Sequence, residues 1–133
     1  MIIAGVDEVG RGCLAGPVVA AAVILKNSIT SLNDSKKLSK KKREILYDNI
    51  IENSQSVSIG IKWNDYIDKH NIKVASEHAM IDAINSLSLR PDKVLVDGFS
   101  LDIDIKNEGI IKGDQKFEQI MACLLYTSDA ADE

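Results

Sequence analysis

The sequence has few cysteines, few aromatic residues and no long apolar run, and each shortage excludes a class of protein. Two cysteines, Cys13 and Cys123, cannot build a disulfide framework, so we expect a reducing setting, most simply the cytoplasm. The apolar stretch from Pro17 to Leu25 is too short to cross a bilayer, so we expect no membrane association. The first residues do not resemble a secretory signal, because no basic region precedes an apolar stretch.

The charge balance is mildly acidic, with 16 basic and 20 acidic side chains and a net charge of −4, which at first argues against a nucleic-acid partner. The distribution is more informative than the sum. A local basic strip beside acidic clusters is typical of metal-dependent enzymes that act on nucleic acid, although a lysine-rich helix start exposed to solvent explains the strip as well. The strip consists of Lys36, Lys37, Lys40, Lys41, Lys42 and Arg43.

The periodicity of apolar residues predicts an α/β fold with one mixed central β-sheet flanked by helices. Short apolar runs predict strands, and apolar residues four apart predict helices. The length fits one domain, and the chain contains no internal repeat or interdomain linker. We expect strands over residues 2–6, 17–25, 57–63, 93–96 and 110–111, and helices over residues 39–53 and 72–87, with a short helix beginning at Asn64.

Two segments alternate between apolar and polar residues, which predicts half-buried strands. In residues 57–63, the apolar side carries Val57, Ile59, Ile61 and Trp63, and the other side carries Ser58, Gly60 and Lys62. In residues 100–105, Asp102 and Asp104 alternate with apolar residues and are expected on the solvent side of an exposed strand.

Carboxylates follow three of the predicted strands. Asp7 and Glu8 end the first apolar run, Asp97 follows Val96, and Asp114 follows the last short strand. If the strands that hold Asp7 and Asp97 are parallel neighbours, both carboxylates emerge at one edge of the sheet. A cluster of hard oxygen ligands favours Mg²⁺ or Mn²⁺ over zinc.

Two points stay open for these carboxylates. Adjacent strand residues point to opposite faces, so Asp7 and Glu8 serve one site only if the strand ends or bulges between them. Asp-Gly is also a common turn pair, so Asp97 could simply end a strand. His70 and His78 lie on predicted helices without metal-ligand spacing, and Trp63 is expected in the core or at its rim.

Several motifs in sequence order resemble the ribonuclease HII family. The long stretch Val6–Val19 carries the most specific match, and Asp34–Ser39, Val96–Gly98 and Lys112–Asp114 follow at suitable intervals. The resemblance covers residues 1 to about 119 and implies an RNase H-like fold. It also implies an endoribonuclease that cuts the RNA strand of RNA–DNA hybrids and ribonucleotides embedded in duplex DNA.

The resemblance assigns roles to individual residues. Asp7, Glu8, Asp97 and Asp114 are implied to be catalytic and to hold two divalent ions, Mn²⁺ or Mg²⁺, for in-line hydrolysis that leaves 5′-phosphate and 3′-hydroxyl ends. The segment Gly10-Arg11-Gly12 is implied to grip the backbone around a ribonucleotide and to sense its 2′-hydroxyl. Lys36 and Lys37 resemble phosphate contacts, which position a duplex without recognising its sequence.

The end of the sequence departs from the family pattern. Residues 1–122 are expected to form a partial catalytic domain that lacks the later helices of the family, and residues 123–133 are interpreted as a foreign tail left by sequence assembly. The alternatives are therefore an inactive fragment or a domain that binds hybrids without cutting them. We expect a monomer.

Overall fold

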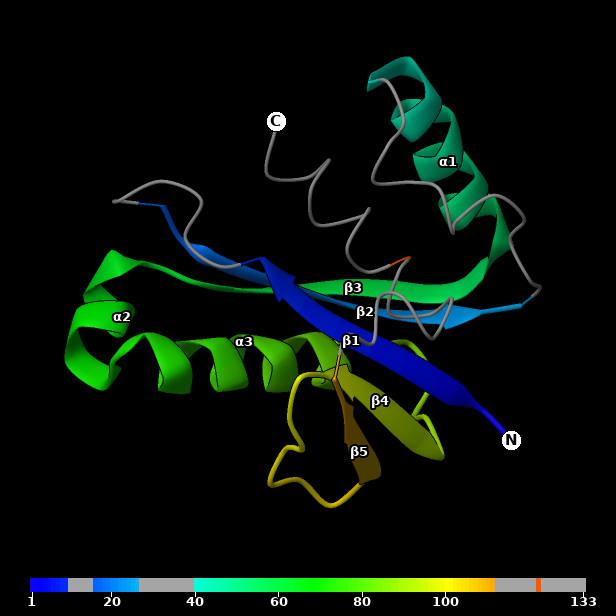
Figure 1. Ribbon diagram of the computed structural model, residues 1–133. Coiled ribbons are helices and arrows are strands. Elements are labelled where there is room, and N and C mark those ends of the chain that lie inside the picture. Colours follow the sequence, from blue (N-terminus) through cyan, green and yellow to red (C-terminus); the bar gives the residue numbers. More distant parts are fainter. Residues whose placement is uncertain (10–15, 27–39, 112–121, 123–133) are drawn as a thin grey trace.

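The computed structural model describes residues 1–9, 16–26, 40–111 and 122, and its centre is a five-stranded sheet in the order β3-β2-β1-β4-β5 (Figure 1). None of the described helices is long and apolar enough to cross a membrane. The elements are β1 (Ile3–Val9), β2 (Val18–Leu25), α1 (Lys40–Asn53), β3 (Ser54–Lys62), α2 (Asn64–His70), α3 (Ile72–Asn85), β4 (Lys93–Asp97) and β5 (Lys106–Ile110).

The sheet is mixed, as the sequence predicts. The first three strands form an antiparallel meander, in which β1 pairs with β2 and β2 pairs with β3. After β3 the chain returns through α2 and α3, and β4 then pairs with β1 in the parallel sense, with β5 parallel to β4. This crossover puts the carboxyl ends of β1, β4 and β5 at one edge of the sheet.

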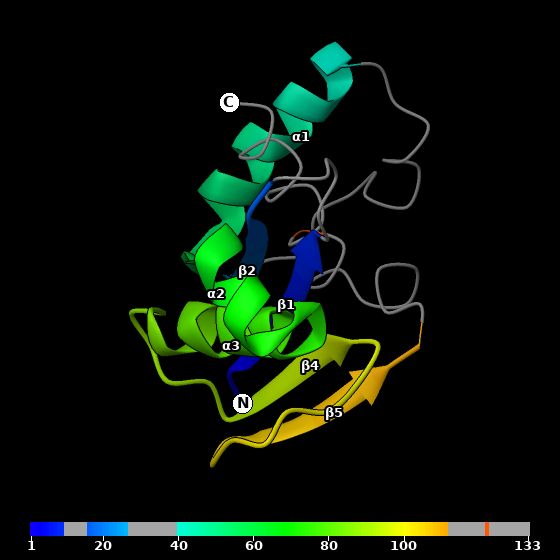
Figure 2. The same cartoon turned by 90° about the vertical axis from the view of Figure 1, so that its left-hand side faces the viewer.

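Helix α3 covers one face of the sheet, and α1 lies on the other side of β3 (Figures 1 and 2). The predicted apolar stripe of α3 is confirmed, because Ala75, Ala79, Met80, Ala83 and Ile84 are all buried. They pack against alternate residues of the strands, which form the core on this face with them. The strand residues of this core are Ala4, Val6, Val18, Ala20, Ala22, Ile24, Val94 and Val96.

The buried side of β3 is the one with the small residues, not the apolar side that its alternation favours. Ser58 and Gly60 are buried under α3, whereas Ile61 is 42% exposed. The reason is close approach of the helix, since a Cβ on Gly60 would lie 2.0 Å from the carbonyl oxygen of Ala79. The hydroxyl of Ser58 also donates a hydrogen bond to the carbonyl oxygen of Ala83.

Several predicted strands differ from the structure. Strand β1 extends to Val9 instead of ending at Val6, because β2 runs back alongside it and supplies pairing partners for residues 7–9. Residues 100–105 form no strand, although Asp102 and Asp104 are exposed as expected. The last described strand is Lys106–Ile110, a mostly polar edge strand whose place is set by parallel pairing with β4.

We predict that Gly60→Ala destabilises the fold by about 2–3 kcal/mol, because the added methyl group collides with helix backbone that cannot move without displacing α3. Urea unfolding followed by circular dichroism measures this free energy. Gln55→Ala, at an exposed position of the same strand, is the matched control and should stay within about 0.5 kcal/mol of the parent chain. Equal stability of the two variants would contradict the proposed close contact.

Candidate functional site

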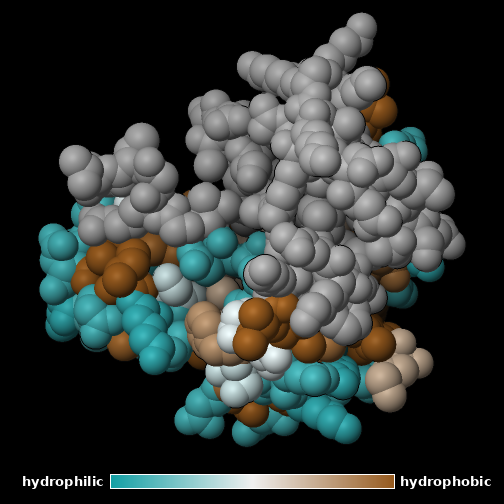
Figure 3. All heavy atoms as spheres, viewed as in Figure 1, coloured by the Kyte–Doolittle hydropathy of each residue, from teal (hydrophilic) through white to brown (hydrophobic). Residues whose placement is uncertain are grey.

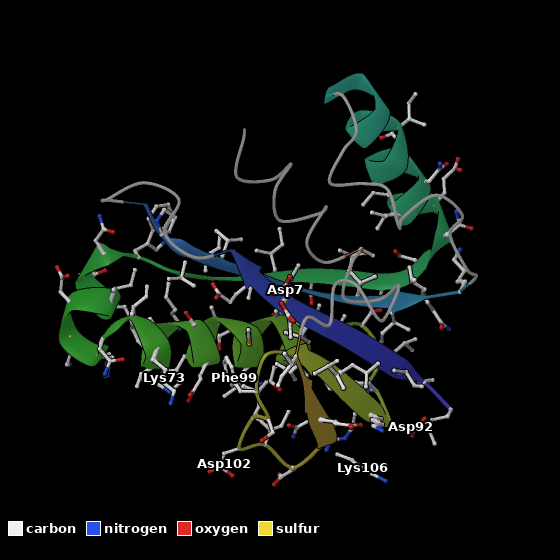
Figure 4. The ribbon with its side chains drawn as sticks, in the orientation of Figure 1. Asp7, Lys73, Asp92, Phe99, Asp102 and Lys106 are labelled. Atoms are coloured by element: carbon white, nitrogen blue, oxygen red, sulfur yellow. The ribbon has the colours of Figure 1, made fainter. Side chains whose placement is uncertain are left out.

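Asp7 and Asp97 lie side by side at the carboxyl edge of the parallel strands. The register pairs Val6 with Val96, and each aspartate is the next residue of its strand. A hydrogen bond joins the two carboxyl groups, which contributes to the raised pKa of Asp7. Figure 4 shows Asp7 in the middle of the molecule, where β1 passes β4, and its side chain is only 5% exposed. The predicted convergence of these two carboxylates is therefore present in the structure.

The environment of Asp7 favours its protonated form. Burial raises the pKa of its carboxyl group from 3.8 to about 8, helped by the negative charges of Asp97 and Glu8 and by the hydrogen bond that protonated Asp7 donates to Asp97. The main-chain N–H of Glu8 donates to Asp7 Oδ1 at 2.8 Å and opposes this shift without cancelling it. Without a cation, Asp7 therefore holds its proton near neutral pH, which avoids two negative charges side by side.

Glu8 occupies the opposite face of the strand. Strand β1 pairs with β2 continuously from Ala4 to Val9, so it neither ends nor bulges between Asp7 and Glu8. A break or bulge in the strand therefore does not bring Asp7 and Glu8 to the same face. In the register, Glu8 stands opposite Ala20, which stands opposite Gly60, so this row belongs to the face under α3.

The carboxylate of Glu8 is nevertheless in an unusual environment. Its Oε2 atom is buried and has no hydrogen-bond partner among the described residues. Burial raises the pKa of Glu8, and the negative charge of Asp97 raises it further. Glu8 therefore lies close enough to Asp97 for the two charges to interact, although its side chain is on the other face of the strand. A buried oxygen without a donor is costly unless a proton or a cation satisfies it.

The described residues hold only part of the predicted site. In the described part of the chain, no group of three or more His, Cys, Asp or Glu side chains is placed to hold a metal ion. The described residues therefore supply the carboxyl groups of Asp7 and Asp97 and the unpartnered Oε2 atom of Glu8. Such oxygen ligands suit a hard divalent cation. The residues that lie outside the described ones are Asp114, Gly10, Arg11, Gly12, Lys36 and Lys37.

The turn after Asp97 is fixed from strand β5. Gly98 has a φ of 98°, which favours glycine, and its N–H donates to the carbonyl oxygen of Ile110 at 2.9 Å. A Cβ on Gly109 would lie 2.5 Å from the backbone of Phe99, so the chain after the turn passes directly over β5. The Asp-Gly turn and the carboxylate pair thus coexist, and neither interpretation of Asp97 excludes the other.

Sequence reasoning missed Asn107, which holds the segment that follows this turn. Its Oδ1 accepts from the N–H of Leu101 at 2.7 Å, and its Nδ2 donates to the carbonyl oxygens of Leu101 and Ile105 at 2.9 and 3.0 Å. A single asparagine in a polar strand gives no sequence signal for such a role. The three bonds close residues 101–105 into a compact segment beside β4 and β5.

The two histidines pack around one tyrosine. The hydroxyl of Tyr66 hydrogen-bonds to His78 Nδ1, and the ring of His70 stacks on Tyr66 with centroids 4.3 Å apart. The Tyr66–His78 contact joins α2 to α3, so these histidines have a structural role, which fits their lack of metal-ligand spacing. Trp63 is 60% exposed, so it lies at the rim and not in the core.

Comparison with known proteins supports the resemblance. The family model described as Ribonuclease HII matches residues 4–133. The ribonuclease HII of Thermotoga maritima is 51% identical over 121 residues, which cover 91% of this chain and 50% of that protein. The chain spans about half the length of the curated relatives it matches.

Solved structures agree with the fold. The crystal structure of ribonuclease H2 from Pyrococcus horikoshii OT3 matches with a TM-score of 0.86 at 25% identity, over 99% of this chain and 72% of that one. A Bst-RNase HIII structure in complex with Mn²⁺ matches with a TM-score of 0.70 at 17% identity, over 100% of this chain and 53% of that one. The fold is therefore RNase H-like, and the chain belongs to the ribonuclease HII family.

Proposed function

We propose that this protein is an endoribonuclease that hydrolyses the RNA strand of RNA–DNA hybrids, including ribonucleotides embedded in duplex DNA. The observation that carries the proposal is the paired carboxyl groups of Asp7 and Asp97 at the ends of parallel strands. Membership of the ribonuclease HII family supports the same activity.

The residues proposed to hold two divalent ions are Asp7, Glu8, Asp97 and Asp114. The buried Asp7 carboxyl group beside Asp97, and the buried Glu8 oxygen without a hydrogen-bond donor among the described residues, both fit a site that a cation would complete. A related RNase HIII has been solved in complex with Mn²⁺, which agrees with Mn²⁺ or Mg²⁺ as the ion. When bound, such ions activate a water nucleophile and stabilise the leaving oxygen of a phosphodiester, which yields 5′-phosphate and 3′-hydroxyl ends.

The chain's own residues have to prepare this site by releasing protons. Asp7 and Asp97 bind a cation only as carboxylates, so the hydrogen bond between them must be lost and its proton given to solvent. Strand pairing keeps both groups at the edge throughout, because neither strand end needs to move for the proton to leave. The segment Gly10-Arg11-Gly12 is proposed to recognise the ribonucleotide, and Lys36 and Lys37 to contact phosphates.

We predict that Asp97→Asn lowers cleavage by the full-length protein by about 100-fold or more, because an amide cannot replace the anionic ligand. Duplex binding should be largely kept, since asparagine preserves the shape of the side chain. Cleavage of a duplex with one ribonucleotide is followed on denaturing gels with Mn²⁺ or Mg²⁺, and binding by fluorescence anisotropy.

Asp102→Asn, which removes an exposed carboxylate, is the matched control and should leave both readouts unchanged. Equal loss of binding and cleavage in Asp97→Asn would point to misfolding, and retained cleavage would refute the assigned role. Binding by the parent protein without cleavage in either metal would favour a domain that binds hybrids and does not cut them.

We predict that the stability of the metal-free chain falls as pH rises from about 5 to 8. The folded chain holds the Asp7 proton up to about pH 8, whereas the unfolded chain releases it near the ordinary aspartate pKa of 3.8. Between these values the folded state binds more protons, so each rise in pH favours unfolding. The melting temperature in a chelator should drop by about 5 °C or more across this range.

Added Mn²⁺ should restore stability more at pH 8 than at pH 5, because protons compete with the cation for the same oxygens. Asp7→Asn should flatten the pH dependence and lose the effect of Mn²⁺, whereas Asp48→Asn, an exposed change on α1, should behave like the parent chain. A pH profile identical in the parent chain and Asp7→Asn would show that Asp7 does not carry the titration.

A further inference from the structure

Strand β3 ends at the same edge of the sheet as the acidic pair, and Trp63 follows it directly. Val9, near the end of β1, pairs with Val19, and Lys62, the last residue of β3, pairs with Val18. The carboxyl ends of β1 and β3 therefore lie at one edge, on either side of the start of β2. Figure 1 shows β3 reaching this edge where α2 begins.

Trp63 also lies on the same face of the sheet as Asp7. The register aligns Asp7 with Ala21 and Ala21 with Ile59, so these three residues share a face. Side chains alternate along a strand, and the backbone of Trp63 is still extended, with φ −89° and ψ 174°. Ile61 and Trp63 therefore continue the face of Ile59, opposite the face that α3 covers.

This face presents apolar surface beside the acidic pair. Ile61 is 42% exposed and Trp63 is 60% exposed. Figure 3 shows hydrophobic residues gathered at the surface near α2, with hydrophilic residues around them. Single exposed apolar residues are common, but a tryptophan and an isoleucine two residues apart on the face of the proposed site form a contact surface.

The backbone under Trp63 is fixed on both sides. Trp63 occupies the N-cap position of α2, and its carbonyl oxygen accepts from the N–H of Ile67 at 3.0 Å. The preceding Lys62 pairs with Asp82 at 2.9 Å and lies 4.4 Å from the centre of the Tyr66 ring. The backbone at this junction needs little ordering when the indole binds a ligand, which lowers that part of the entropic cost of the contact.

The spacing suits a nucleic-acid duplex. Two strand spacings of about 4.8 Å and four residues of about 3.4 Å put the Cα atoms of Asp7 and Trp63 roughly 17 Å apart. That distance corresponds to about five base pairs at the 3.4 Å rise of B-form DNA, and to slightly more in an A-like hybrid, whose base pairs are closer together. A hybrid cut at the acidic pair would thus extend over Trp63, and its wide, shallow minor groove exposes sugars that an indole can pack against.

We infer that Trp63, supported by Ile61, is a positioning residue that packs against a sugar in the minor groove of the bound hybrid, about five base pairs from the cut. The inference rests on the proposed function, because it needs the hybrid to lie across the acidic pair. It adds a contact at β3 to those proposed for Gly10-Arg11-Gly12, Lys36 and Lys37.

The intrinsic tryptophan fluorescence of the chain comes from Trp63 alone, because it is the only tryptophan. Adding a 20-base-pair hybrid to the chain should quench its fluorescence and protect it from acrylamide. Hybrid binding by anisotropy without any change in tryptophan emission would overturn the inference and leave the proposed function intact. No hybrid binding at all would refute both. Emission that changes with protein concentration and not with hybrid would assign the surface to contacts between copies of the chain.

Substitutions test the contribution to affinity. Trp63→Ala should weaken hybrid binding about 10-fold, within the range found for aromatic contacts to nucleic acid, and Trp63→Phe should restore most of it. Ile72→Ala removes another exposed apolar side chain, at the start of α3, and should leave binding unchanged. Equal weakening by Trp63→Ala and Ile72→Ala would overturn the inference.

The position of the contact is tested with asymmetric duplexes. Two DNA duplexes each carry one ribonucleotide, placed three base pairs from one end in the first duplex and three base pairs from the other end in the second. When the ribonucleotide is bound at the acidic pair, one of the two duplexes ends before it reaches Trp63. The parent chain and Trp63→Ala should bind that duplex equally and differ about 10-fold on the other. A constant ratio on both duplexes would show that Trp63 does not contact the hybrid where the geometry requires it.

Discussion

The parallel pairing of β1 with β4 is the constraint on which the rest of the site depends. It makes Asp7 and Asp97 neighbours although they are 90 residues apart in the chain. Two carboxylates in a buried setting repel each other, and burial together with this repulsion raises the pKa of Asp7. The same repulsion makes the pair suitable for a divalent cation, because a bound ion neutralises the two negative charges that folding brings together.

That pairing is possible because α3 carries the chain from one side of β1 to the other. The crossover has to lie close to the sheet, and small residues allow this on both surfaces. Gly60 lets β3 approach the backbone of Ala79, and Ala20 continues the same row toward Glu8. Packing at one end of the row therefore reaches the acidic edge of the sheet at its other end. Asn107 and Gly109 position the chain that follows Asp97. Asn107 hydrogen-bonds to Leu101, and Gly109 allows the backbone of Phe99 to pass close to β5.

The sequence was sufficient for much of this arrangement. Local apolar periodicity predicted the mixed sheet and the buried stripe of α3, and carboxylates after apolar runs predicted the meeting of Asp7 and Asp97. Features that depend on distant partners were not predictable. The extension of β1 to Val9 needs β2 beside it, and β5 is polar and exists because β4 pairs with it. The three bonds of Asn107 likewise depend on a segment that has no pattern of its own.

The sequence did not reveal which side of β3 faces the core, and that choice leaves the proposed nucleic-acid contact exposed. Alternation identifies two faces of a strand, but the element that covers them decides which one is buried. Here close approach of α3 selects Ser58 and Gly60, and the more apolar face stays at the surface beside the acidic edge. Hydrophobicity alone would place Ile61 and Trp63 in the core. Their exposure instead follows from a helix that needs small residues beneath it, so the packing that builds the crossover also leaves an aromatic side chain on the face of the proposed site.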